Sequence, residues 1–212
     1  MESKNLYLDL LGLVAFLVFS IFIFTSLALY PHPYSLLFDW QSNLGNINLN
    51  PAGAMFFNWG CIITGIILLP FILNLYRWRP ERTWKKILLI ISILVGVYAC
   101  ISLIGVGLFP ETHIKLHVIA ASGVFESLFL ITVLITISLF KHPKFMRPVA
   151  LIGICAAVID LAFLIVLSLP AYKDLLASFN PTVPVPGLEW LAVFSSLIWM
   201  GVLSYNMYRN KI

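Results

Sequence analysis

The chain has 212 residues, of which 61% are hydrophobic and only 10% are charged. Soluble globular domains carry about a quarter charged residues, so this composition excludes an ordinary water-soluble domain. The formal net charge of +4 could suit a nucleic-acid partner. The basic residues, however, gather in short clusters between apolar runs, as in membrane proteins. We therefore expect membrane lipids, and no nucleic acid, as partners.

Six apolar runs of roughly 20 residues or more follow one another, and this length spans a ~30 Å hydrocarbon core. Backbone polar groups in lipid need internal partners, and continuous apolar runs without alternation exclude a β-barrel. We predict an all-α integral membrane protein, a six-helix transmembrane bundle in which residues 1–212 form one domain. The predicted spans are Leu6–Tyr30, Pro51–Tyr76, Ile87–Phe109, Ile114–Phe140, Val149–Leu169 and Leu188–Tyr208.

Lys and Arg residues mark alternate joins between these spans. Of the 13, all but two lie in the two tails and in the joins 77–86 and 141–148, while Lys115 and Lys173 lie on the other side. Because cytoplasmic loops carry an excess of Lys and Arg, we predict that both termini and both basic joins are cytoplasmic. The stretch GLFPETHIKLH, which begins at Gly107, then faces outward.

Local signals place helix ends and helix contacts. Asn50 followed by Pro51 is typical of an N-cap and the first position of a helix, so we predict that the second helix begins there. Small residues four apart let a neighbouring helix approach closely. In the second span these pairs are Gly60 with Thr64 and Cys61 with Gly65.

Polar side chains collect at the predicted outer ends of spans two to four. The first outer loop is rich in Asn, and the next outer join places a Glu, a Lys and two His together. Since three outer joins converge over one bundle mouth, we predict a ligand-binding corner. Its candidate residues are Asp39, Ser42, Asn50, Asn58, Glu111, His113 and His117.

Two histidines in this corner allow a metal site as an alternative. On a helix, His113 and His117 would share one face and could bind Zn²⁺ with a third ligand. The pattern lacks the Glu of the metalloprotease motif HExxH. In the other interpretation Glu111 complements the positive helix end and the histidines bond loop carbonyls. We expect no cofactor, with zinc as the alternative. The candidate third ligands are Glu111, Asp39, His32, Asp174 and Glu189.

Two acidic residues fall near the middle of predicted spans. Glu126 and Asp160 lie in the fourth and fifth spans. A carboxylate at this depth costs at least ~2.5 kcal/mol, so each needs a proton, a hydrogen bond, water or a cation. Nine positions at roughly 100° each place Glu126 opposite His117 on the helix. We therefore predict that the histidine corner and Glu126 lie in separate environments.

Three groups of residues form short motifs at the predicted outer ends of the spans. They are Ser42-x-Leu44-Gly45, Asn50-Pro51 with Phe57-Asn58-x-Gly60 and Gly65, and Gly107-x-Phe109-Pro110-Glu111 with His117. With these motifs the chain resembles the bacterial and archaeal membrane proteins of domain of unknown function 998 (DUF998), which have about six predicted spans. It is more distantly similar to the Frag1/DRAM/Sfk1 membrane proteins. The resemblance implies no established activity, but it favours a prokaryotic plasma membrane.

A comparison with alkaline ceramidases and adiponectin-receptor-like proteins tests the enzyme alternative. Those proteins hold zinc with three His in seven spans. This chain has six predicted spans and one His pair, so His32 would have to join His113 and His117, since His142 lies on the cytoplasmic side. That departure weighs against a ceramidase-like enzyme.

We therefore expect a non-catalytic protein whose outer corner binds a lipid headgroup or a small ligand. One alternative is a zinc-dependent lipid hydrolase, in which His113 and His117 ligate the metal. The other is a proton- or cation-coupled carrier that works through Glu126 and Asp160. Six spans also leave room for a homo-oligomer.

Overall fold

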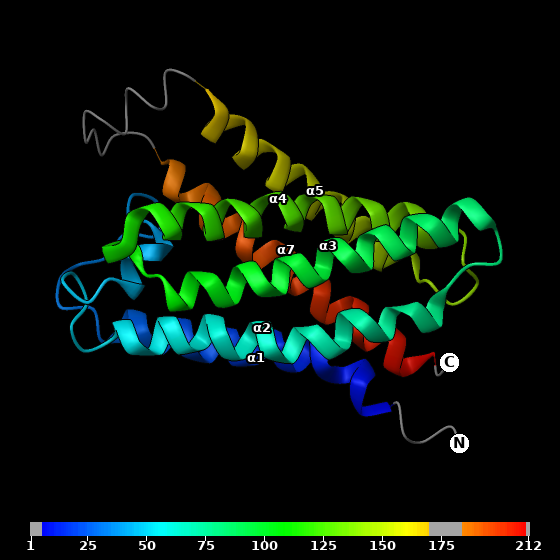
Figure 1. Ribbon diagram of the computed structural model, residues 1–212, viewed down its shortest axis with the longest axis horizontal. Helices are drawn as coiled ribbons and strands as arrows, with labels where there is room; N and C mark the ends of the chain where they lie inside the picture. Colours follow the sequence, from blue (N-terminus) through cyan, green and yellow to red (C-terminus); the bar gives the residue numbers. More distant parts are fainter. Residues whose placement is uncertain (1–5, 170–183, 211–212) are drawn as a thin grey trace.

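The computed structural model describes residues 6–169 and 184–210, and in these ranges it contains helices and no strand. Six of the helices are long and apolar enough to cross a membrane, which confirms the predicted six-span bundle (Figure 1). They are α1 (Leu6–Ala28), α2 (Ala54–Asn74), α3 (Thr83–Leu108), α4 (Ile114–Leu139), α5 (Arg147–Ser168) and α7 (Val185–Arg209). Three short 3₁₀ helices join them, namely η2 (Gln41–Gly45), η3 (Leu75–Trp78) and η4 (Glu111–His113).

The predicted start of the second helix needs a correction. Residues 51–53 form turns, and α2 begins at Ala54 rather than at Pro51. The side chain of Asn50 still caps this segment, because its Oδ1 accepts a hydrogen bond of 3.1 Å from the N–H of Gly53. Asn50 therefore caps this segment as predicted, but a turn at residues 51–53 separates it from the first residue of α2.

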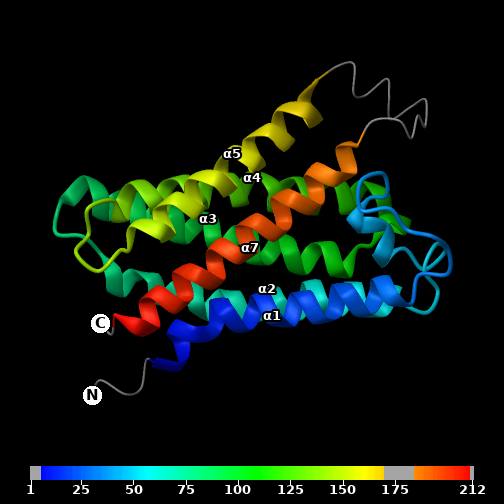
Figure 2. The same ribbon diagram turned by 180° about the vertical axis from the view of Figure 1, so that it is seen from behind.

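The helices form a closed ring in chain order. Each packs on the next, and α7 closes the ring against α1. Direct contact between α4 and α7 is slight, and α5 packs on both of them from the outside. Towards its C-terminal end α5 leans away from α4, as both views show (Figures 1 and 2). α4 and α7 are therefore linked mainly through α5.

Both described chain ends lie at one end of the bundle (Figures 1 and 2). The basic joins meet the same end, since Asn206 of α7 donates to the carbonyl of Lys144 over 3.1 Å. Asp9 of α1 forms an ion pair of 3.1 Å with Arg77. The basic clusters thus gather as predicted, while their cytoplasmic side stays a prediction.

Two glycines bring α2 against its neighbours. A Cβ on Gly60 would lie 2.6 Å from the Cβ of Phe22 in α1, and one on Gly65 would lie 2.8 Å from the carbonyl oxygen of Cys100 in α3. Distances below 3.0 Å leave no room for a methyl group. The predicted close approach of helices at these small residues is confirmed.

Replacing Gly65 by alanine should destabilise the bundle by about 1–3 kcal/mol, because the new methyl group meets backbone that cannot turn aside. Gly201→Ala is the matched control, since its Cβ would have no neighbour nearer than 3.6 Å. This control should be neutral or gain up to about 1 kcal/mol of helix propensity. Unfolding in detergent followed by circular dichroism measures both. Equal stability of the two variants would contradict the packing argument.

The predicted orientation can be tested with single thiols. Lys115 at the start of α4 and Arg82 before α3 are both exposed, at opposite ends of the bundle. In a background with Cys155→Ser, which removes the one exposed native cysteine, Lys115→Cys should react with an impermeant maleimide added to intact cells. Arg82→Cys should react only after the membrane is opened. The reverse pattern would invert the topology.

Candidate functional site

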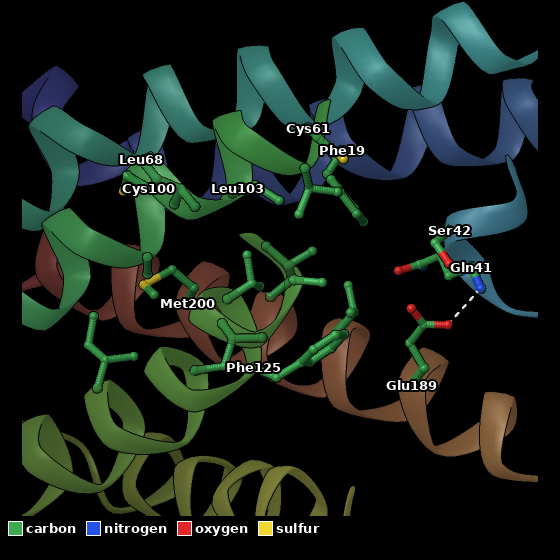
Figure 3. Close-up of a pocket in the computed structure, with 18 of the residues that line it drawn as sticks. Phe19, Gln41, Ser42, Cys61, Leu68, Cys100, Leu103, Phe125, Glu189 and Met200 are labelled. Atoms are coloured by element: carbon green, nitrogen blue, oxygen red, sulfur yellow. Dashed lines mark hydrogen bonds between the residues drawn. The ribbon is translucent and has the colours of Figure 1, made fainter. Parts of the chain in front are cut away.

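A narrow cavity of about 80 Å³ runs inside the ring between α1, α2, α3, α4 and α7. Along α4 its lining extends from His117 to Ile131, roughly 21 Å at 1.5 Å per residue. Most of the wall is apolar, and Figure 3 shows Phe19, Leu103 and Met200 among its side chains. The cavity therefore offers a long, thin, hydrocarbon-like space.

Four polar side chains close one end of this cavity, namely Gln41, Ser42, His117 and Glu189. The backbone N–H of Gln41 donates to Oε2 of Glu189 over 2.7 Å, the contact drawn in Figure 3. Gln41 is 4% exposed and Glu189 is 6% exposed. The Nε2 amide nitrogen of Gln41 is buried and has no hydrogen-bond partner. An unpaired buried donor is costly, so this end of the cavity is suited to receive a polar group.

His117 lies in the first turn of α4 and is 6% exposed. Its Nδ1 lies 2.9 Å from the carbonyl oxygen of Phe109. Because a carbonyl only accepts, Nδ1 carries a hydrogen and donates it to Phe109. The contact agrees with the prediction that a corner histidine bonds a loop carbonyl.

Glu111 ties the first outer loop to the join between α3 and α4. Its Oε1 accepts from the hydroxyl of Ser42 over 2.5 Å, and its Oε2 accepts from Nδ2 of Asn46 over 3.3 Å. Ser42, Glu111 and His117 also line one groove between α4 and α5. The structure thus brings together three of the residues that the sequence placed in one corner.

His113 does not join them, which corrects the predicted helical pair. It precedes α4, is exposed, and has its Nδ1 3.2 Å from the hydroxyl of Thr112, whereas His117 is buried. Among the described residues no three His, Cys, Asp or Glu side chains are placed to hold one metal ion. Asp174, a candidate third ligand, lies outside the described residues.

Three other predicted site residues support the loop instead of lining the cavity. Oδ2 of Asp39 accepts from the N–H of Ser35 over 2.7 Å, and Nδ2 of Asn58 donates to the carbonyl of Gly45 over 3.1 Å. Nδ2 of Asn50 is shared among the carbonyls of Ser26 and Leu44 and the hydroxyl of Ser26. These bonds fix η2, and through it the position of Gln41.

The groove between α4 and α5 has a volume of about 490 Å³ and adjoins the interior cavity. Ala121 and Phe125 line both spaces, and the ring of Phe125 packs edge-on against Phe163 of α5 at 4.7 Å. A thin aromatic wall therefore separates the groove from the cavity, at the end where α5 leans away.

Glu126 lines this groove together with His117, which corrects the prediction of separate environments. The two residues are nine positions apart on α4, and His117 is buried. Glu126 itself is exposed.

Asp160 has a different setting from Glu126. It is 2% exposed, its Oδ2 accepts from the hydroxyl of Ser196 over 2.8 Å, and its Oδ1 has no hydrogen-bond partner. It lines neither the cavity nor the groove. The two intramembrane acids therefore do not share a site.

Two tyrosines outside the spans, Tyr30 and Tyr34, lie near carboxylates of the polar end. Burial raises the pKa of Tyr34 far above its usual value, and the charges of Glu189 and Asp39 add to this. Burial also raises the pKa of Tyr30, with Asp39 and Glu111 contributing. In the described part of the chain no Lys or Arg lines the cavity or the groove.

Gln41 was missed as a site residue, and Glu189 was considered only as a possible metal ligand. Glu189 had a signal, because it is the one acidic residue inside the last predicted span and such residues are expensive there. Its place next to the predicted boundary at Leu188 made it look like a loop residue. Gln41 had no such signal in the sequence, since its role depends on contact with α7.

Replacing Asn50 by alanine should destabilise the protein by at least about 2 kcal/mol, because the partners of its buried amide lose their bonds. Asn48→Ala is the matched control in the same loop. Asn48 is exposed, and the change should stay within about 0.5 kcal/mol. Thermal unfolding in detergent measures both variants. Similar values for the two would show that Asn50 does not fix the loop.

Comparison with known proteins gives one match. Neither a curated protein nor a solved structure matches the chain. The sequence model of one family, described as "Protein of unknown function (DUF998)", matches residues 13–206. This match covers nearly the whole six-helix bundle, and it confirms the predicted resemblance of the chain to this family. The chain therefore belongs to the DUF998 family.

Proposed function

We propose that this protein binds a single-chain amphiphile, with the headgroup at Gln41 and Glu189 and the hydrocarbon chain in the interior cavity. The observation that carries the proposal is the buried, unpartnered Nε2 of Gln41 at the polar end of an apolar cavity. A bound headgroup oxygen would satisfy this donor. The proposal makes the predicted lipid-headgroup or small-ligand site more specific.

The shape of the cavity supports one unbranched chain. The lining covers roughly 21 Å of α4 at 1.5 Å per residue, while the volume is only about 80 Å³. A space of this volume has no room for a ring system or for two chains side by side. It holds a few methylene groups of one flexible chain, and the rest of the path has to widen to take more. Burial of its methylene groups would contribute about 0.8 kcal/mol each.

The groove between α4 and α5 supports entry from the side. It adjoins the cavity at Ala121 and Phe125 and carries Ser42, Glu111 and Glu189 at its polar end. An amphiphile lying in the membrane would meet the groove with its headgroup already at the level of these residues. It would then need to pass only the wall formed by Phe125 and Phe163.

The other two hypotheses have less support. A zinc-dependent hydrolase needs His113 and His117 at one site, and one of them is exposed while the other is buried. A carrier through Glu126 and Asp160 needs a common path, and the two acids lie in separate settings. Both stay predictions without a contact that favours them.

Replacing Ala121 by phenylalanine should reduce binding of a monoacyl probe at least about tenfold, a change of roughly 1.4 kcal/mol. The reason is steric, since Ala121 lines both the cavity and the groove. Ile119→Phe is the matched control, because Ile119 lies on the same helix, is 66% exposed and lines neither space.

Native mass spectrometry of delipidated protein titrated with a monoacyl glycerol measures the occupancy. We expect one bound molecule per chain for the native protein and the Ile119→Phe control. Circular dichroism checks that both variants are folded. Equal occupancy in a folded Ala121→Phe variant would reject the cavity as the binding site.

A further inference from the structure

We infer that the headgroup is a hydrogen-bonding cation beside an acceptor oxygen, which makes the ligand class a long-chain amino alcohol. The inference rests on the proposed function, because it concerns only the head of the bound amphiphile. It distinguishes this ligand from fatty acids and alkyl phosphates, which are anionic, and from neutral glycerides and diols.

Glu189 supplies the first reason. It is 6% exposed, and one backbone N–H, that of Gln41, donates to it across 2.7 Å. A carboxylate buried among apolar side chains is costly unless it is paired and hydrogen-bonded. Its side chain lies at the polar end of the cavity, facing η2 (Figure 3). An ammonium group at this end would donate to the carboxylate and neutralise it.

The surrounding charges supply the second reason. Glu111 and Glu126 line the groove through which the ligand would enter, together with Glu189. No Lys or Arg belongs to the lining that the structure describes. A carboxylate or phosphate headgroup would enter this region against repulsion, whereas a cation would be attracted.

Gln41 supplies the third reason, and it indicates that the headgroup also carries an acceptor oxygen. Its unpartnered Nε2 can only donate, so an ammonium group alone would leave it unsatisfied. A hydroxyl next to the ammonium group could accept from Gln41 while the ammonium donates to Glu189. The two polar groups of an amino alcohol thus match a donor and an acceptor that the protein already holds close together.

The test compares three probes of the same chain length, a long-chain amino alcohol, the corresponding diol and the alkyl phosphate, by native mass spectrometry of the delipidated full chain. The diol differs from the amino alcohol in the charged group alone. We expect the amino alcohol to bind at least about tenfold more tightly than the diol, as for a charge-assisted hydrogen bond, and the phosphate to bind most weakly.

Glu189→Gln should abolish the preference for the amino alcohol and leave diol binding within about threefold. The reason is that the amide carries no negative charge to pair with the ammonium group. Glu81→Gln is the control, since Glu81 is exposed in the join between η3 and α3. Figure 1 shows this join at the opposite end of the bundle from η2. It should keep the preference. Retention of the full preference in a folded Glu189→Gln variant would overturn the role of Glu189.

The probe comparison on the native protein decides the inference even if Glu189→Gln does not fold. Equal binding of diol and amino alcohol, or tightest binding of the phosphate, would overturn the cationic headgroup and leave the amphiphile site intact. Failure of all three probes to bind would instead reject the proposed function itself.

Discussion

The hydrogen bond between the backbone of Gln41 and the carboxylate of Glu189 is the contact on which the polar end depends. It joins the first outer loop to the last helix, 148 positions apart in sequence, at a distance of 2.7 Å. With it in place, η2 covers the open end of the ring and the side chain of Gln41 turns into the cavity lining. A loop amide, a helix carboxylate and an apolar interior thereby become one site.

The loop can hold this position because its own polar groups are satisfied by local and distant partners. Asn50 ties it to α1 through Ser26, Asn58 ties it to α2, and Glu111 ties it to the start of α4 through Ser42. Backbone groups in a segment without regular structure need such partners when water is excluded. The asparagine-rich composition of the loop therefore serves mainly to keep η2 in place.

Much of the fold could be predicted from sequence, and the site only in part. The number of spans follows from the length of apolar runs, and no helix boundary moved by more than four residues, the largest shift being at Thr83. The start of α4 at Ile114 was predicted correctly, and it leaves His113 outside the α-helix and exposed, so His113 does not pair with His117 on one helix face. An error of one or two residues in a helix boundary does not change whether a helix is predicted. It can change whether a side chain near the end lies in the helix, and on which face.

Contacts between distant segments could not be read from local patterns. Ser42, Glu111 and His117 were grouped correctly because topology alone places them at one end of the bundle. Gln41 and Glu189 were not, because their pairing depends on how α7 packs against the loop. The groove likewise arises from the tilt of α5, which no residue pattern within α4 indicates.

Because α4 and α7 make little direct contact, they are linked mainly through α5. α5 packs on α4 through Phe163 and Phe125, and Asp160 is hydrogen-bonded to Ser196 of α7. Beyond Phe163, Val166 and Leu167 pack against Val185 and Ala192 at the start of α7. Widening of the groove between α4 and α5 would therefore move the C-terminal half of α5 together with the first turns of α7.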